Sequence, residues 1–238
     1  MTEPLFRDAY QKRATGTVLA HSDTGGVILD RAIFYPTGGG QPGDTGRLTW
    51  DGGALEVANT VKGQGDQIVL IAADPASLPA IGTEVAQDLA WETRYRHMRV
   101  HTALHLLSVV IPLPVTGGSI SPEKGRLDFD MPEAPDDKQV IEEALNALIA
   151  RDLDVADSWI TDEELAAKPE MVKTMSVQPP TGAGHVRLIR IGSADQQVDL
   201  QPCGGTHVAK TSEIGPMRLG KIEKKGRQNR RVYIHLTD

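Results

Sequence analysis

The sequence contains two histidines one helical turn apart, in the segment His101-Thr-Ala-Leu-His105. On a helix, residues four positions apart share one face, with their Cβ atoms about 6 Å apart. Two ring nitrogens placed in this way can bind one Zn²⁺ ion at distances of about 2.0–2.1 Å. Position 102 is threonine rather than the glutamate of an HExxH motif, so the segment has no built-in general base. Alone, the spacing is weak evidence, because it also arises by chance.

The single cysteine of the chain lies in a second pair, Cys203-Gly-Gly-Thr-His207. The two glycines allow a tight turn that brings a thiolate and an imidazole to one point. A buried cysteine beside a glycine turn is the alternative interpretation. Taken together, the two pairs supply three imidazoles and one thiolate, a donor set suited to one Zn²⁺ ion per chain. We therefore predict a shared metal site of His101, His105, Cys203 and His207.

Four protein ligands are typical of a closed structural zinc site, whereas a catalytic zinc keeps one position open. We interpret His101, His105 and Cys203 as firm ligands, and His207 as a weaker ligand or as the group that holds a water molecule. Beyond the metal-bound water, the sequence identifies no catalytic residue. His97 lies about 12 Å along the helix from His105, too far to share the metal. It either contacts substrate phosphate or is exposed on a basic helix end.

A glycine-rich loop follows a predicted strand, in the segment FYPTGGGQPGDTG at residues 34–46. It lacks the Gly-Lys-Ser/Thr ending of a P-loop and the glycine spacing of a dinucleotide-binding motif. A long hairpin loop is the simpler interpretation. Three adjacent glycines also let a ligand approach the backbone closely. On this alternative the candidate substrate-binding residues are Gly38, Gly39, Gly40 and Gln41.

The elements that must position these residues fall into two predicted parts. Residues 1–72 contain short strand-like runs between Gly, Asp, Asn and Pro residues, which is typical of a small barrel or sandwich. Residues 73–82 are predicted to be a linker. The second part is predicted to be α+β, with helices first and an antiparallel sheet after them. Its expected elements are a helix over 91–111, a helix over 140–149 capped by Asp136 or Asp137, a short helix opened by a Thr161–Glu164 capping box, a hairpin over 186–201 and a strand over 232–236.

Composition limits the class of protein. The chain has 238 residues and a formal charge of −7. It contains no apolar run long enough to span a membrane, and its charged start lacks the apolar region of a secretory signal. One cysteine cannot form an intrachain disulfide, which favours a reducing cytoplasm.

Charge is unevenly distributed along the chain. Residues 128–170 contain 14 acidic and 3 basic residues, whereas residues 210–231 contain 8 basic and 2 acidic residues. The acidic total argues against a general nucleic-acid coat, but the basic segment and the basic helix start at residues 94–99 could contact a phosphate backbone. A solvated hairpin is the simpler interpretation of the basic segment.

The segments FYPTGGGQPGDTG, HTALHLL, DLQPCGGTHV and the following EIG resemble the editing module of alanyl-tRNA synthetase. The chain lacks the length and the motifs of the aminoacylation core. It is therefore identified as a member of the freestanding alanyl-tRNA editing proteins of the AlaX type. The resemblance implies an α+β fold: a small β-barrel domain with the glycine-rich motif over residues 1–88, and an editing domain with an antiparallel sheet over residues 89–238, similar to that of threonyl-tRNA synthetase.

The resemblance also implies a function and a set of site residues. The expected activity is zinc-dependent deacylation of tRNA(Ala) mischarged with serine, and in some members with glycine. The four metal-binding positions carry over directly, but Leu104 replaces the Thr of the more usual HTATH, so any polar role there is lost. Thr116 is the nearest match to a threonine that recognises the serine hydroxyl. The candidate tRNA contacts are Arg99, Lys224, Lys225, Arg227 and Arg230.

Two alternatives remain open from the residues alone. A zinc-dependent hydrolase of a small ester or amide would share the metal site without needing the basic segment or the glycine loop. A zinc-stabilised tRNA-binding module would bind tRNA without hydrolysing it. No membrane and no obligate protein partner are implied.

Overall fold

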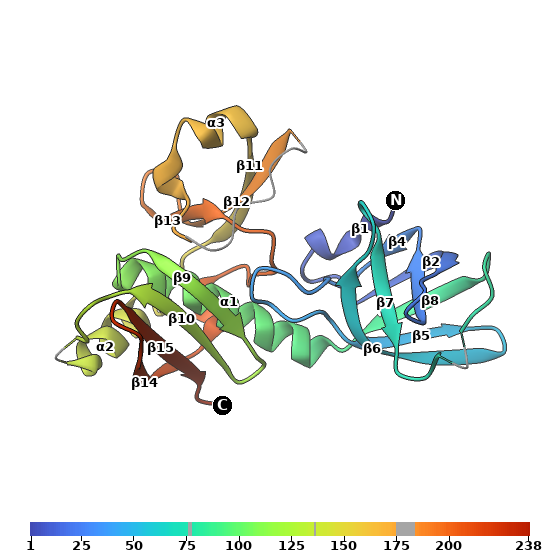
Figure 1. Ribbon diagram of the computed structural model, residues 1–238, viewed down its shortest axis with the longest axis horizontal. Coiled ribbons are helices and arrows are strands. Elements are labelled where there is room, and N and C mark those ends of the chain that lie inside the picture. The colour runs from blue at the N-terminus through green and yellow to red at the C-terminus, as the bar shows by residue number, and fades with distance from the viewer. Residues whose placement is uncertain (76–77, 136, 175–183) are drawn as a thin grey trace. The chain divides into compact units, whose positions relative to one another are not determined.

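A computed structural model of the chain describes residues 1–75, 78–135, 137–174 and 184–238. The described residues form two compact units, Met1–Tyr95 and Arg96–Asp238 (Figure 1). The division falls within helix α1 (Trp91–Val110). Among the described residues, no helix is both long and apolar enough to cross a membrane.

The first unit is a closed barrel of six antiparallel strands in the order β2-β3-β7-β6-β5-β8. Inward and outward residues alternate along its strands, most clearly in β8, because successive strand side chains point to opposite faces. The strands are β2 (Arg13–His21), β3 (Gly26–Leu29), β5 (Gly46–Trp50), β6 (Gly53–Lys62), β7 (Ile68–Ala72) and β8 (Glu84–Leu89). Two short segments, β1 (Glu3–Pro4) and β4 (Arg31–Ala32), pair in parallel, and a 3₁₀ turn (Leu5–Arg7) follows β1.

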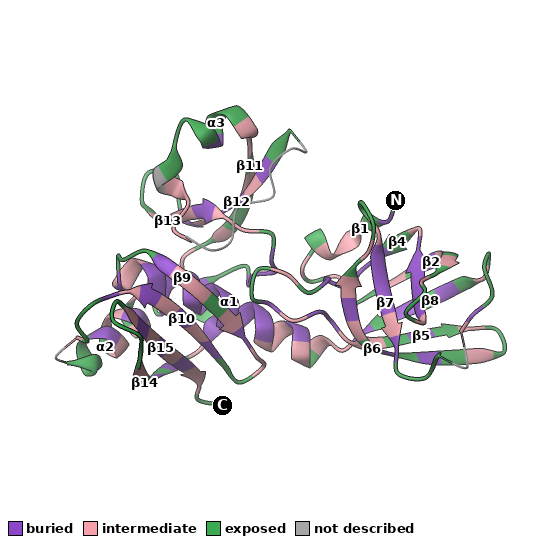
Figure 2. Cartoon of the chain, viewed as in Figure 1, coloured by how far each residue is buried: buried purple, intermediate pink, exposed green. Residues whose placement is uncertain are grey.

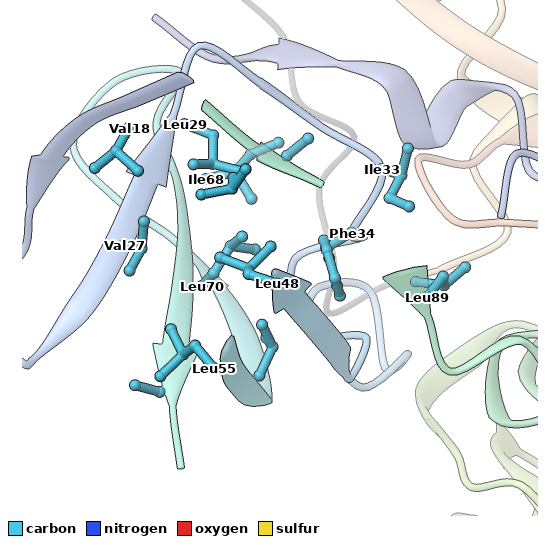
Figure 3. Packing of buried hydrophobic residues seen from close by; sticks show 14 residues of the cluster. Val18, Val27, Leu29, Ile33, Phe34, Leu48, Leu55, Ile68, Leu70 and Leu89 are labelled. Atoms are coloured by element: carbon cyan, nitrogen blue, oxygen red, sulfur yellow. The ribbon is translucent and has the colours of Figure 1, made fainter. Parts of the chain in front are cut away.

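Aliphatic side chains with one phenylalanine fill the barrel. Leu29, Phe34, Leu48 and Leu70 are fully buried and point toward one another (Figure 3). Each aliphatic side chain contributes about 1.5–3 kcal/mol on burial. The low aromatic content of the chain therefore does not prevent a packed core.

Arg94, on the first turn of α1, is buried completely within the first unit. Its guanidinium forms an ion pair with Asp44 and donates to the backbone oxygens of Ile33, at 2.8 Å, and Ala9, at 3.1 Å. The Asp44 carboxylate also accepts a hydrogen bond from the Tyr35 backbone N–H. The expectation that Arg94 belongs to an exposed basic segment is therefore wrong, because this guanidinium holds the start of α1 to the barrel.

The second unit contains two antiparallel sheets and the remaining helices (Figure 1). One sheet has the order β14-β15-β10-β9 and the other β11-β12-β13. Helix α2 packs against β14, and its buried residues Ile141, Leu145 and Ile149 follow the i, i+4, i+8 spacing of one helix face. The elements are β9 (Val115–Ile120), β10 (Lys124–Asp130), α2 (Lys138–Ile149), β11 (Val155–Thr161), α3 (Asp162–Ala166), β12 (His185–Gly192), β13 (Gln197–Pro202), β14 (Met217–Lys225) and β15 (Asn229–Leu236), with 3₁₀ turns at Pro169–Met171 and Thr211–Ile214.

The predicted fold class is confirmed, and so are most of the predicted elements of the second part. Asp137 caps α2 by accepting from the Gln139 backbone N–H, whereas Asp136 lies outside the described residues. The Thr161–Glu164 capping box opens α3. The order of helices before sheet is wrong, because β9 and β10 lie between α1 and α2. Strands β6, β8 and β11 were not predicted either, and the predicted linker includes residues 76–77, which the structure does not describe.

The buried ion pair generates a stability prediction for the first unit. Asp44→Asn removes one partner and leaves the Arg94 charge buried without its carboxylate, which typically costs about 3–5 kcal/mol. Asp88→Asn is the matched control, because its pair with Arg13 is 3.4 Å long and both side chains are more than half exposed. The control should change the free energy of unfolding by less than about 1 kcal/mol. Urea unfolding of the two variants measures the difference, and equal losses would contradict a structural role for the Arg94 pair.

Candidate metal centre

Helix α1 is buried along its C-terminal half, and every residue from His97 to Ser108 is buried (Figure 2). His101 and His105 lie one turn apart with ring centroids separated by 5.3 Å. His97 is also buried, which excludes the alternative of a histidine exposed on a helix end. The helix therefore carries polar side chains into an interior where each of them needs a partner.

The loop after β13 brings Cys203 and His207 to the same helix face. The His207 ring centroid lies 4.2 Å from that of His101 and 4.6 Å from that of His105. Arg187 on β12 holds the loop, because its guanidinium donates to the backbone oxygens of Cys203, at 3.3 Å, and Gly205, at 2.8 Å.

The four predicted ligands come together in the structure. One donor atom from each of His101, His105, Cys203 and His207 lies within 4.8 Å of the others. The Cys203 Sγ is 3.5 Å from His101 Nε2 and 3.3 Å from His207 Nε2. Tetrahedral bonds of about 2.0–2.3 Å place ligand atoms roughly 3.3–3.8 Å apart, so the cluster can hold a metal ion after small adjustments.

Two of the imidazoles have a fixed orientation. Thr102 donates its only hydroxyl proton to the Met98 backbone oxygen at 2.9 Å. It must therefore accept from His207, whose Nδ1 is 3.1 Å away, and this leaves His207 Nε2 with its lone pair toward Cys203. In the same way, His105 Nδ1 donates to Asp199 Oδ2 at 3.1 Å. Such outer hydrogen bonds fix the tautomer that a metal-binding histidine needs.

Asp199 is the centre of a buried polar network. Its side chain is fully buried, and it accepts from Gln201 Nε2 at 2.7 Å and from Lys173 Nζ at 2.6 Å, besides His105. Burial raises the pKa of Asp199, but the hydrogen bond and charge of His105, together with Lys173, lower the pKa to about 2. Ser108 donates to the His105 backbone oxygen at 2.7 Å and completes the network. The carboxylate therefore remains ionised and aligned on His105.

The protonation states suit metal binding. Burial raises the pKa of the Cys203 thiol, but the neighbouring imidazoles, His101 above all, outweigh it and hold the pKa well below its ordinary value. Burial and the charge of His101 lower the pKa of His207. Burial also lowers the pKa of His105, but hydrogen bonds to Asp199 and Cys203 raise the pKa to about 9. A metal ion would therefore meet a thiolate and a neutral His207, and would displace one proton from His105.

The other predicted site residues lie in different places. Thr116 is on β9, and its hydroxyl donates to the Asp128 backbone oxygen at 3.1 Å. The adjacent Val115 donates its backbone N–H to the Lys173 oxygen at 2.9 Å, so the start of β9 lies beside the residue that binds Asp199. Thr116 is therefore the chain neighbour of a residue whose backbone contacts Lys173, a member of the network around Asp199.

The glycine loop belongs to the first unit. Gly38 and Gln41 exchange two backbone hydrogen bonds, and Gly39 and Gly40 between them adopt positive φ angles of 57° and 85°. Such angles favour glycine. A Cβ added to Gly39 would meet no atom within 4 Å, so the tip of this turn is open to a ligand, whereas Gln41 is fully buried.

The predicted tRNA contacts separate into two groups. Arg99 is buried, donates Nε to the Ile214 backbone oxygen and pairs with the Asp238 carboxylate at 2.9 Å. Arg230 is also buried and donates to the Asn229 backbone oxygen at 3.1 Å. By contrast, the tip of the β14–β15 hairpin carries the exposed side chains Lys224, Lys225 and Arg227.

Sequence reasoning missed Asp199, Thr102, Arg187 and Lys173. Asp199 and Thr102 had a local signal, since each lies close in the chain to a predicted ligand. Arg187 and Lys173 had none, because their contacts depend on how the second sheet folds. These residues orient or support the four-donor cluster.

The network predicts that Asp199 strengthens metal binding. Asp199→Asn keeps the size of the side chain but removes the charge that orients His105, and outer-sphere losses of this kind typically weaken metal affinity by about 10–100-fold. Asp195→Asn is the control, because Asp195 is exposed in the turn between β12 and β13 and the change in charge is the same. Competition for Co²⁺ or Zn²⁺ with a chromophoric chelator measures the affinities. Equal affinity of the two variants would show that Asp199 does not orient a ligand.

Comparison with known proteins places the chain among tRNA-editing and synthetase sequences. The family described as "Threonyl and Alanyl tRNA synthetase second additional domain" matches residues 186–233, which include β12, β13 and the Cys203–His207 loop. The family described as "tRNA synthetases class II (A)" matches residues 6–93. The alanine–tRNA ligase of Pyrobaculum calidifontis is 33% identical over 93% of this chain, but the match spans only 25% of the ligase.

Two shorter relatives match along their length. The alanyl-tRNA editing protein AlaX-M of Methanosarcina barkeri is 36% identical over 100% of both chains. That of Saccharolobus solfataricus is 35% identical over 98% of each chain. With the four-donor cluster in place and this likeness over the full length, the chain belongs to the alanyl-tRNA editing proteins of the AlaX-M type.

Proposed function

We propose that the protein is a trans-editing deacylase, which hydrolyses tRNA(Ala) mischarged with serine and releases the amino acid. The observation that carries the proposal is the buried cluster of three imidazoles and one thiolate in a chain of the alanyl-tRNA editing family. Hydrolysis of glycine from the same tRNA is a second activity to test. Residues 1–88 would form the barrel domain with the glycine-rich motif, and residues 89–238 the editing domain.

We propose zinc as the metal, held by His101, His105, Cys203 and His207. A thiolate with three imidazoles favours Zn²⁺ over the hard, oxygen-preferring cations. When bound, zinc supplies Lewis acidity that polarises a carbonyl or lowers the pKa of water. A cysteine that must remain a thiolate suits a reducing compartment, which supports the cytoplasm as the site of action.

The reaction needs positioning more than strong chemistry. The substrate is an ester between the amino acid carboxyl and the ribose of the tRNA 3′ end. Water adds to the ester carbonyl carbon, the bond from that carbon to the ribose oxygen breaks, and a proton returns to the ribose oxygen. Because the ester is already reactive, holding it next to a water molecule in a partly dry site accounts for much of the rate. The four-donor cluster lies against the buried half of α1, which would keep bulk water away from one side of a bound ester.

Selection for serine requires a polar group that binds its hydroxyl. A site that hydrogen-bonds a substrate hydroxyl rejects the analogue without it, which for serine is alanine. Thr116 is our candidate, since its neighbour Val115 hydrogen-bonds Lys173 of the Asp199 network. The Thr116 hydroxyl donates to the Asp128 backbone oxygen, and a hydroxyl oxygen is also a hydrogen-bond acceptor, the role that the serine hydroxyl requires.

We propose that the glycine turn at Gly38–Gly40 contacts the substrate by its backbone, with Gln41 closing the turn. The open space above Gly39 supports this role. For the tRNA, the exposed cations Lys224, Lys225 and Arg227 are better placed than Arg99 and Arg230, whose guanidinium groups bind partners within the protein.

The activity is tested by deacylation of Ser-, Gly- and Ala-tRNA(Ala) by the purified protein. We expect Ser-tRNA(Ala) to lose its amino acid, Ala-tRNA(Ala) to persist, a strong zinc chelator to abolish hydrolysis and added Zn²⁺ to restore it, because the metal is part of the site. Hydrolysis of a free serine ester as efficiently as the charged tRNA would favour the small-ester hydrolase instead. Binding of tRNA without deacylation would favour the non-catalytic module.

The role of Thr116 generates a second test. Thr116→Val keeps the shape but removes the hydroxyl, so hydrolysis of Ser-tRNA(Ala) should fall by roughly 5–30-fold, the equivalent of about 1–2 kcal/mol. Ser119→Ala on the same strand removes a hydroxyl elsewhere and should leave the rate unchanged. If the two variants hydrolyse Ser-tRNA(Ala) equally fast, Thr116 has no part in recognising serine.

A further inference from the structure

The sheet β14-β15-β10-β9 has two faces of different chemistry. Burial alternates along β10 and β15, so that Leu127, Phe129, Val232 and Ile234 face the interior. The opposite side chains face solvent. Within the described strands, this solvent face carries six cations and three acids. The cations are Lys124, Arg126, Arg218, Lys221, Lys225 and Arg231, and the acids are Asp128, Asp130 and Glu223. The face is therefore positive in a chain whose formal charge is −7.

The cations are concentrated at one end of this face. The register places Lys124 opposite His235, and His235 opposite Arg218. Side chains directly opposite on neighbouring strands have Cβ atoms about 5 Å apart, so Lys124 and Arg218 lie roughly 10 Å apart on either side of His235. Both are exposed. This row across three strands contains three basic side chains and no acid.

The next row continues the pattern. It contains Arg126 on β10 and Tyr233 on β15, with Lys221 5.5 Å from the Tyr233 ring. Acids enter only in the third row, where Asp128 pairs with Arg126 and Arg231 and Glu223 pairs with Lys221. The cations of the later rows thus have carboxylate partners in the same sheet. Within the described strands, the excess positive charge comes from Lys124 and Arg218 in the first row.

The first row places two cations on either side of one imidazole. Lys124 and Arg218 lie on β10 and β14, with β15 between them, so their mutual repulsion across about 10 Å of exposed surface is weak. Partial burial, and then the charges of Arg218 and Lys124, lower the pKa of His235, which keeps the imidazole neutral between them. Gly220 also makes room for this ring, because a Cβ there would lie 2.6 Å from His235 Nε2. The row therefore presents two exposed cations with one ring between them.

We propose that this solvent face, the cationic sheet face of Lys124, Arg126, Arg218, Lys221, Tyr233 and His235, binds the sugar–phosphate backbone of the tRNA. The inference rests on the proposed function for the identity of the polyanion. Cations on a paired sheet have their backbone positions fixed by the register, and they complement the spaced negative charges of a nucleic acid. A polyanion laid across the first row places phosphate charges next to both Lys124 and Arg218.

Binding of uncharged tRNA(Ala) tests the proposal without relying on catalysis. Lys124→Ala/Arg218→Ala removes the two cations of the first row. Lys138→Ala/Arg151→Ala is the matched control, since these exposed cations flank α2, outside the face, and the change in net charge is the same. We expect the first pair to raise Kd about tenfold and to lower the slope of log Kd against log salt by about 1.5–2, measured from about 50 to about 200 mM salt. The control should shift Kd by less than about twofold.

The outcomes separate this proposal from the deacylase function. Suppose that the Lys124→Ala/Arg218→Ala variant unfolds at the same temperature as the wild type and binds tRNA as tightly. The cationic sheet face then does not bind tRNA, whether or not the wild type deacylates. If the first pair loses binding and the wild type fails to hydrolyse Ser-tRNA(Ala), the face is supported and the deacylase function is overturned. Unchanged tRNA binding with lost binding to phosphatidylserine vesicles would assign the face to a membrane surface and overturn the proposal.

Discussion

The second unit depends on one constraint, the need to satisfy the polar side chains of a buried helix. Between His97 and Ser108, helix α1 carries Arg99, Thr102 and His105 into the interior. A buried polar group without a partner costs about 1–3 kcal/mol or more, so each requires a partner from elsewhere in the chain. Ile214 and Asp238 bind Arg99, His207 and Val208 bind Thr102, and Asp199 binds His105. All of these partners lie in the last 40 residues, which explains why the C-terminal segments fold back onto α1.

The same contacts determine what the site can do. Thr102 holds His207 and Asp199 holds His105 by hydrogen bonds of equal length, 3.1 Å. The geometry therefore gives no reason to treat His207 as weaker than His105, contrary to our interpretation of the sequence. If all four donors bind the metal firmly, the ion orients the substrate or stabilises the fold, and the water must be placed by neighbouring groups. Asp199 and Lys173 are charged groups beside His105, and Lys173 is the more accessible of the two, with 28% of its side chain exposed.

Features that depend on residues near in the chain could be predicted from the sequence, whereas those that depend on distant partners could not. The helix that carries His101 and His105, the caps at Asp137 and Thr161, and the hairpin before Cys203 depend on neighbours in the chain, and these predictions were confirmed. Strand β9 contains two adjacent glycines and has little strand propensity of its own. It forms because β10 pairs with it. Arg94 and Arg187 appear in the sequence as surface cations, and only the partners Asp44 and the Cys203 loop show that they are structural.

The charge contrast between the acidic middle and the basic C-terminal segment is likewise redistributed by folding. Asp128 pairs with Arg231, and Asp152 and Asp154 pair with Lys210. The pairs of Lys210 are about half exposed and contribute little stability, but they still cancel charge. Counting residues along the chain therefore overstates the positive potential near Lys210 and Arg231. It understates the potential near Arg218 and Lys124, which come from distant parts of the sequence and are placed in one row by the register of β10, β15 and β14. Strand register, rather than segment charge, therefore decides where the exposed cations of the second unit gather.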